Sequence, residues 1–132
     1  MKIQSTINKF IFNNRFFKAR ATRLEAIDEI KDNGCKIIRE RAIGCKSRVI
    51  LGYKNEYSDL ASMAAKVSSD GSFEYKYSSA VYSPIPSSKK TYSIRKVKTD
   101  RHGNTDVEIK KLVTQDGKIY DNYSKVTHYE NP

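Results

Sequence analysis

Strict alternation of apolar and polar residues in the second half of the chain sets narrow limits on its fold. The apolar members of this pattern are Phe73, Tyr75, Tyr77, Tyr92, Ile94, Val107 and Ile109. A period of two places one set of side chains on a buried face and the other set in water. The pattern predicts half-buried antiparallel strands that end as a β-meander over residues 91 to about 123, followed by a frayed C-terminal tail.

Turn residues divide these strands. Two prolines and several serines at residues 83–88 cannot lie in a central strand, so we expect a flexible loop over residues 83–90. Residues 101–104 and 115–118 are predicted turns, and the second contains Asp116-Gly117, a strong hairpin signal.

The clearest helix is predicted over residues 22–33. Thr22 followed by Glu25 forms a capping box, Leu24, Ile27 and Ile30 with Ala26 form an apolar stripe, and Gly34 is a suitable C-terminal stop. Two β-branched runs follow, residues 36–43 and 47–53, and Gly44-Cys45-Lys46 between them predicts a hairpin.

A second helix is expected over residues 58–66, with Leu60, Met63, Ala64 and Val67 on one side. Residues 9–20 before the first helix are predicted to be a strand, or a strand with a tight turn at Asn13-Asn14. A chain of 132 residues suits one domain, so the sequence predicts a single basic α+β domain over residues 1–132, an antiparallel β-sheet with helices near its N-terminus.

The formal charge is +10, from 25 Lys and Arg against 15 Asp and Glu. Residues 1–54 and 89–132 are basic and residues 55–88 are close to neutral, so we expect an interaction surface that draws on both ends. A field of this sign attracts polyanions and acidic proteins.

The residues point away from catalysis. The chain has two histidines, His102 in a predicted turn and His128 in the tail, and we expect both to be solvated surface residues rather than a catalytic acid or base. Cys35 and Cys45 cannot form a zinc site alone, and we expect them to be two free thiols that lie too far apart to bridge. The sequence therefore predicts no enzyme, no cofactor and no metal.

Cations alternate with phenylalanines at residues 9–23. Such a segment can bind a nucleic-acid backbone while an exposed ring stacks on a base. The alternative is a core strand with solvated cations, which the spacing of Phe10 and Phe12 favours. In either case Arg15, Lys18, Arg20 and Arg23 are candidate binding residues, expected to form one exposed cationic patch with Arg39 or Arg41 nearby.

The segments Lys9-Phe10-Ile11-Phe12, Arg23-Leu24-Glu25-Ala26-Ile27 and Ile37-Ile38-Arg39-Glu40-Arg41 resemble the small RNA polymerase-associated proteins of T-even bacteriophages. The resemblance implies a non-enzymatic accessory that binds host RNA polymerase and modulates transcription in the bacterial cytoplasm. It carries over no binding residues.

Three partner classes stay open. They are an acidic protein complex such as RNA polymerase, DNA or RNA bound directly, and a host nuclease or defence complex that a basic face would inhibit. With no membrane-spanning run or signal peptide in the sequence, we expect a cytoplasmic protein without a membrane partner.

Overall fold

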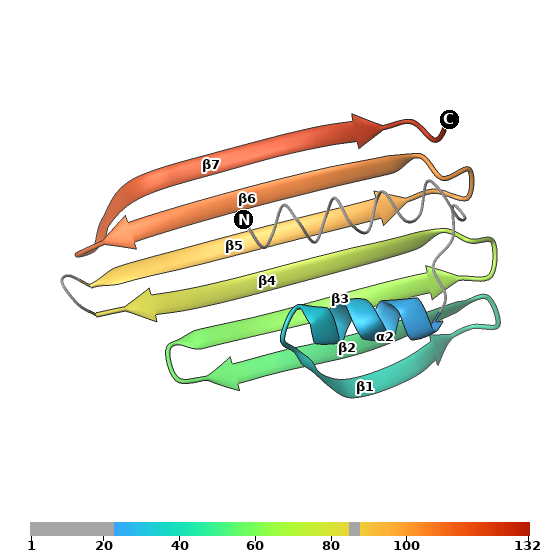
Figure 1. The fold of residues 1–132 in the computed structure, drawn as a ribbon, viewed down its shortest axis with the longest axis horizontal. Coiled ribbons are helices and arrows are strands. Elements are labelled where there is room, and N and C mark those ends of the chain that lie inside the picture. The colour runs from blue at the N-terminus through green and yellow to red at the C-terminus, as the bar shows by residue number, and fades with distance from the viewer. Residues whose placement is uncertain (1–22, 85–87) are drawn as a thin grey trace.

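The computed structural model describes residues 23–84 and 88–132. In this part of the chain one helix is followed by seven strands (Figure 1). The elements are α2 (Arg23–Asp32), β1 (Lys36–Ile43), β2 (Ser47–Glu56), β3 (Asp59–Ser68), β4 (Phe73–Ser83), β5 (Lys89–Thr99), β6 (Thr105–Gln115) and β7 (Lys118–Tyr129). The predicted strand over residues 9–20 lies outside the described residues.

The strands form one antiparallel sheet in which sequence order and spatial order are the same, β1 to β7. Each strand pairs with the next through a short connection, as the sequence predicted for the second half of the chain. The ladder shifts register between Ile37 and Arg39 in β1 and between Val113 and Thr114 in β6. An α+β class is therefore confirmed in its coarse form, an antiparallel sheet with a helix at the N-terminal end of the described chain.

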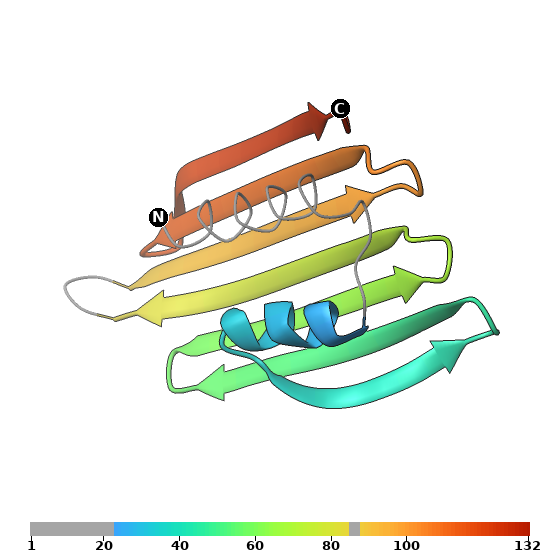
Figure 2. The same cartoon turned by 45° about the vertical axis from the view of Figure 1, so that its right-hand side comes forward.

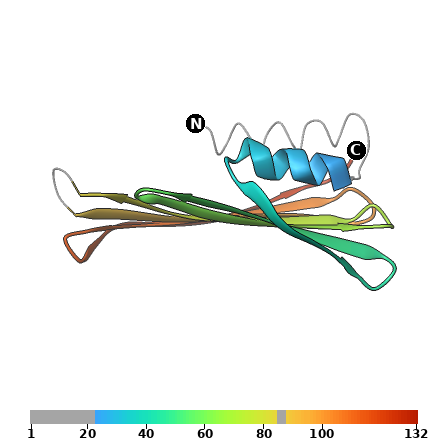
Figure 3. The same cartoon turned by 90° about the horizontal axis from the view of Figure 1, so that it is seen from below.

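Helix α2 covers one side of the sheet, over β1, β2 and β3 (Figures 2 and 3). Ala26 and Ile30, one turn apart, are fully buried, and Ile27 packs against the same core. Leu24 was expected in this stripe, but its side chain is 66% exposed. The buried stripe thus centres on Ala26 and Ile30, because a small residue allows the helix to approach the sheet closely.

The end of α2 is as predicted. Gly34 has a φ of +82°, which favours glycine, and its N–H donates to the carbonyl of Lys31 (2.9 Å). Asn33 then joins the helix to the sheet, because its Oδ1 accepts from Nη2 of the buried Arg95 in β5 (2.6 Å). The Arg95 guanidinium also lies 4.9 Å from the ring centre of Tyr77. Burial lowers the pKa of Arg95 from its ordinary value.

The second predicted helix is wrong. Residues 59–68 form strand β3, in which Ala61, Met63, Ala65 and Val67 alternate as buried positions. Alanine, leucine and methionine favour helices in isolation, but pairing with both β2 and β4 outweighs that preference.

The hairpin of β1 and β2 is confirmed, as are the turns at residues 101–104 and 115–118. Asp116 and Gly117 have φ values of 51° and 79°, the left-handed pair expected of a two-residue hairpin turn. The last strand runs to Tyr129, past the expected end near Tyr123. Cys35 is buried before β1 and Cys45 is exposed after it, and both are free.

Strands β4 and β5 are joined across residues 84–88, of which 85–87 lie outside the described part of the chain. The predicted loop is therefore shorter than residues 83–90, because Ser83, Lys89 and Lys90 belong to the paired strands.

Candidate nucleic-acid interface

The two sides of the sheet are distinguished by the position of Gly52. A Cβ placed at Gly52 would lie 2.2 Å from Cγ2 of Ile30, so Gly52 faces α2. Successive side chains of a strand alternate between the two sides, and residues paired across strands share a side. The register therefore assigns every strand residue to the helix side or to the opposite side. We call the opposite side the open face, because no helix of the described chain covers it (Figure 3).

Five lysines meet near the centre of the open face. This lysine cluster comes from four adjacent strands and consists of Lys66, Lys76, Lys96, Lys98 and Lys110. Lys76 in β4 is paired directly with Lys96 in β5. Directly paired side chains have Cβ atoms about 5 Å apart, and like charges at that separation destabilise a sheet.

Three carboxylates lie among these lysines. Glu74 is paired with Lys66 on one side and with Lys98 on the other, and Lys98 is paired in turn with Asp106. Glu108 Oε1 lies 3.1 Å from Lys110 Nζ. Cations still exceed carboxylates across the open face, because β1 adds Lys36, Arg39 and Arg41 to the same side.

A tyrosine hollow adjoins the lysine cluster. Its floor is made of small residues, Ser62, Ser78 and Ala80, and it is bordered by the larger Tyr53, Leu60, Tyr92 and Ile94. The hollow is shallow and has a volume of about 360 Å³. Tyr53 and Tyr92 are each 41% exposed, so their rings are accessible from solvent. The open face thus combines stacking surfaces with cations one side-chain step away along the strands.

The candidate binding residues chosen from sequence are only partly placed. Arg15, Lys18 and Arg20 lie outside the described residues. Arg23 is on the helix side, where its Nε and Nη2 both contact the carboxylate of Glu40, Nη2 at 2.8 Å. Arg48 Nη1 also reaches Glu40, at 3.2 Å. The hydrogen bond from Arg23 lowers the pKa of Glu40 from its ordinary value.

Arg39 and Arg41 flank Glu40 along β1, and the register places both on the open face. The structure therefore separates Arg23 from Arg39 and Arg41, which lie on opposite sides of the sheet. The lysines of β3 to β6 were not among the binding residues predicted from the sequence. Their alternation with buried residues was visible, but only the register shows that they converge.

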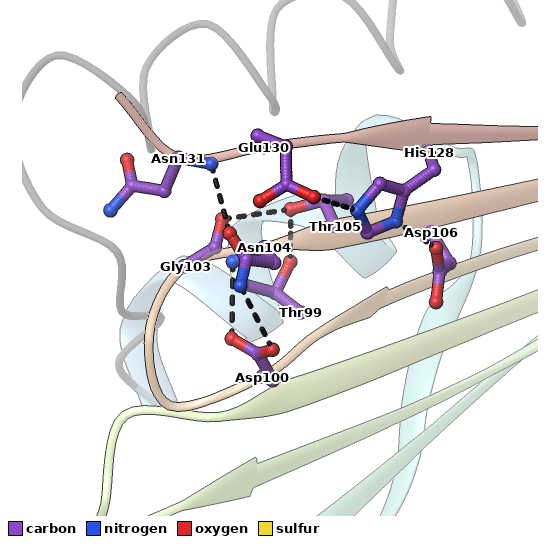
Figure 4. Close-up of polar contacts among 9 residues, drawn as sticks. All are labelled: Thr99, Asp100, Gly103, Asn104, Thr105, Asp106, His128, Glu130 and Asn131. Atoms are coloured by element: carbon purple, nitrogen blue, oxygen red, sulfur yellow. Dashed lines mark hydrogen bonds and ion pairs between the residues drawn. The ribbon is translucent and has the colours of Figure 1, made fainter.

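A second polar cluster joins the chain's end to the turn between β5 and β6 (Figure 4). Asp100 accepts from the backbone N–H of His102 (2.8 Å) and Asn104 (3.1 Å), and Asn131 donates its backbone N–H to Oδ1 of Asn104 (3.0 Å). Nearby, the His128 ring lies between two carboxylates, with Nδ1 2.5 Å from Asp106 and Nε2 2.6 Å from Glu130. These residues form what we call the C-terminal clasp.

The two carboxylates raise the pKa of His128 from its ordinary value, because they favour the protonated ring. Both ring nitrogens are engaged, so this arrangement stabilises an imidazolium ion and leaves neither nitrogen free to accept a proton. In the described ranges no group of three or more His, Cys, Asp or Glu side chains is arranged to hold a metal ion.

A scan against protein-family models, a search of curated proteins and a search of solved structures each find no match to this chain. Within residues 23–84 and 88–132, no helix has the length and apolar character needed to cross a membrane.

Proposed function

We propose that this protein is a non-catalytic binding protein that holds a single-stranded nucleic acid across the open face of its sheet. The observation that carries the proposal is the direct pairing of Lys76 with Lys96. Two like charges paired in this way reduce the stability of the sheet. On its other side Lys96 is paired with Glu108, which offsets part of the repulsion, whereas Lys76 is paired on its other side with Ala64. A bound polyanion such as a phosphate backbone would reduce the repulsion that remains.

The neighbouring tyrosine hollow favours a single strand over a duplex. Unpaired bases stack on exposed aromatic rings, and this contact tolerates any base sequence. The hollow lies one side-chain step from the lysine cluster, about 7 Å along the strands. A nucleotide can therefore contact lysine through its phosphate and Tyr53 or Tyr92 through its base.

Binding is tested with short labelled single-stranded DNA and RNA and a matched duplex, measured by fluorescence anisotropy over a range of salt. We expect log affinity to fall linearly with log salt, with a slope of about 0.7 per phosphate neutralised on a single strand. Replacing Tyr92 by Ala should cost about 1–3 kcal/mol of binding free energy, the usual range for one stacked base.

Lys76→Glu is the most informative variant. The substitution removes the repulsion and places a carboxylate opposite Lys96. Residue 76 is exposed, and its other paired neighbour is the uncharged Ala64. We expect binding to weaken while thermal stability stays the same or rises, by up to about 1 kcal/mol. Thermal melts of the free protein and anisotropy of the complex measure the two effects.

Lys111→Glu is the matched control. It makes the same change in net charge on an exposed residue of β6, but the register places Lys111 on the helix side. If both variants lost the same binding affinity, the net charge of the protein and not the open face would determine binding. That result would contradict the proposal.

An acidic protein partner is the competing outcome. The resemblance to phage RNA polymerase-associated proteins suggests host RNA polymerase, and a host nuclease complex belongs to the same class. If wild-type protein fails to bind any nucleic acid but binds purified RNA polymerase after nuclease treatment, the open face recognises protein and our proposal is wrong.

A further inference from the structure

Strand β7 forms an unusually exposed edge of the sheet. Among the described elements only β6 pairs with it. Its large apolar residues are accessible, with Ile119 69%, Tyr120 70%, Tyr123 46% and Val126 69% exposed. A long apolar edge strand is a template for pairing with another strand. We therefore expect the β7 edge either to bind another strand or to be protected from such pairing.

The sequence of β7 is complementary to itself in one register. In an antiparallel pair of two copies centred on Tyr123, Asp121 of each copy lies directly opposite Lys125 of the other. The same register places Tyr123 opposite Tyr123 and Asn122 opposite Ser124. Opposite charges and aromatic pairs are the cross-strand pairs that stabilise sheets.

We infer that two copies of this chain associate through β7 in this register, around a two-fold axis at Tyr123. Paired residues must share a side of the sheet, so a shift of the centre is allowed only in whole residues. Moving the centre to Asn122 or Ser124 separates Asp121 from Lys125 and loses both ion pairs. The charges therefore select one register.

The rest of the edge is compatible with this pairing. The register shift opposite Val113 and Thr114 lies before Asp121, and from Asp121 to Tyr129 the ladder is regular. At the other end the C-terminal clasp directs Asn131 toward Asn104 and His102, away from the outer edge of β7 (Figure 4).

The opposite edge of the sheet does not offer the same surface. Strand β1 pairs regularly only over residues 39–43, because of the register shift between Ile37 and Arg39, whereas β7 pairs regularly over residues 121–129. Pairing two copies of β1 around Glu40 would place Arg39 opposite Arg41, two like charges. The edge pairing is thus specific to β7 and closes as a dimer, since each copy offers one such edge.

The two-fold axis is perpendicular to the sheet, so both open faces point the same way. The dimer then has one continuous sheet and one extended basic face with two lysine clusters. Self-association does not depend on nucleic-acid binding, and each is measured without the other.

Sedimentation velocity over a range of protein concentrations tests the dimer with wild type, Asp121→Lys, Lys125→Asp and the double variant. An interface made of one strand pair is small, so we expect a reversible dimer. Each single variant places like charges opposite each other twice and should weaken dimerisation about tenfold or more. The double variant restores both ion pairs and should restore the dimer.

The two single variants distinguish pairing in this register from general charge repulsion, because only the first explanation predicts weaker dimerisation for both. Asp121→Lys raises the net charge and Lys125→Asp lowers it, so repulsion alone would make the second variant dimerise more strongly. Lys46→Asp, in the exposed turn between β1 and β2, is the control for lowered charge. Wild type that stays monomeric up to about 0.5 mM, or a double variant no better than the singles, would overturn the inference.

Discussion

Gly52 determines how closely α2 approaches the sheet. A Cβ at this position would meet Cγ2 of Ile30 at 2.2 Å and Cβ of Cys35 at 3.1 Å. Since Ile30 is fully buried, its side chain has little space in which to move. At this contact the backbone of Gly52 in the sheet therefore packs directly against the branched side chain of Ile30 in the helix.

Gly52→Ala should destabilise the protein by about 1–3 kcal/mol, because the added methyl forces Ile30 to shift within a packed core. Ile30→Ala alone should cost about 2–5 kcal/mol through the cavity it leaves. In the double variant the new methyl enters that cavity, so the loss of stability should be smaller than the sum of the losses in the two single variants. Urea denaturation of the four proteins checks this, and strict additivity would show that the two residues are not in contact.

The residues of the candidate interface illustrate what a sequence can and cannot predict. Alternation in β4 indicated that Lys76 faces away from Tyr75 and Tyr77. In β5 the prediction was wrong, because Tyr92 and Ile94 were expected on the buried side but lie on the open face with Lys96. The buried residues of β5 are Arg95, Val97 and Thr99. The direct pairing of Lys76 with Lys96 depends on the length of the β4–β5 connection, which composition does not specify. Arg23 was selected for its neighbours in sequence, but Glu40, distant along the chain, neutralises it.

Among the elements, β3 is the one that local patterns predicted wrongly. Two of the buried residues of β3, Ala61 and Ala65, are alanines, and a helix lying close above a strand leaves little room for larger side chains. Small, helix-favouring residues conceal the two-residue period that β4 and β6 display with larger side chains. The hairpin of β1 and β2 and the turn at Asp116-Gly117 were predicted correctly, since glycines there mark backbone turns.

Strand β7 carries a pH-dependent contact through His128. Its raised pKa means that the folded protein binds the proton more tightly than the unfolded chain. The stabilisation is complete below the unfolded value of about 6.5 and is lost as the pH rises through the folded value. We expect the melting temperatures of wild type and His128→Asn to differ at about pH 5.5 and to converge at alkaline pH.

The comparison uses His102→Asn as its control, because the His102 ring lies in a turn and accepts from Arg101 (3.3 Å). An NMR titration of His128 gives its pKa directly. A His128 value at or below about 6.5 would show that the carboxylates of Asp106 and Glu130 do not hold the ring.

Over the whole molecule, charge is distributed unevenly between the two sides of the sheet. The helix side pairs Arg23 with Glu40 and Lys54 with Asp59, the latter at 2.7 Å. The open face carries the unbalanced lysines, and the chain as a whole has a charge of +10. Self-repulsion of this kind lowers the stability of a compact state.

Added sodium chloride should therefore stabilise the free protein, because the Debye length falls to about 10 Å at 0.1 M. A gain of 1 kcal/mol corresponds to a rise in melting temperature of about 3–5 °C for a domain of this size. Lys76→Glu should gain less from salt than wild type, since part of its repulsion is already removed. Calorimetry at increasing salt measures both, and equal gains would locate the repulsion elsewhere.

The strictly sequential strand order has a consequence for how the chain folds. Every strand pairs with the next one along the sequence, so each pairing closes only a short loop and loses little chain entropy. Sheets that join distant segments fold slowly, whereas local pairing permits faster folding. The hairpin of β1 and β2, which α2 covers, can form first, and strands β3 to β7 can then add one at a time as the ribosome releases them.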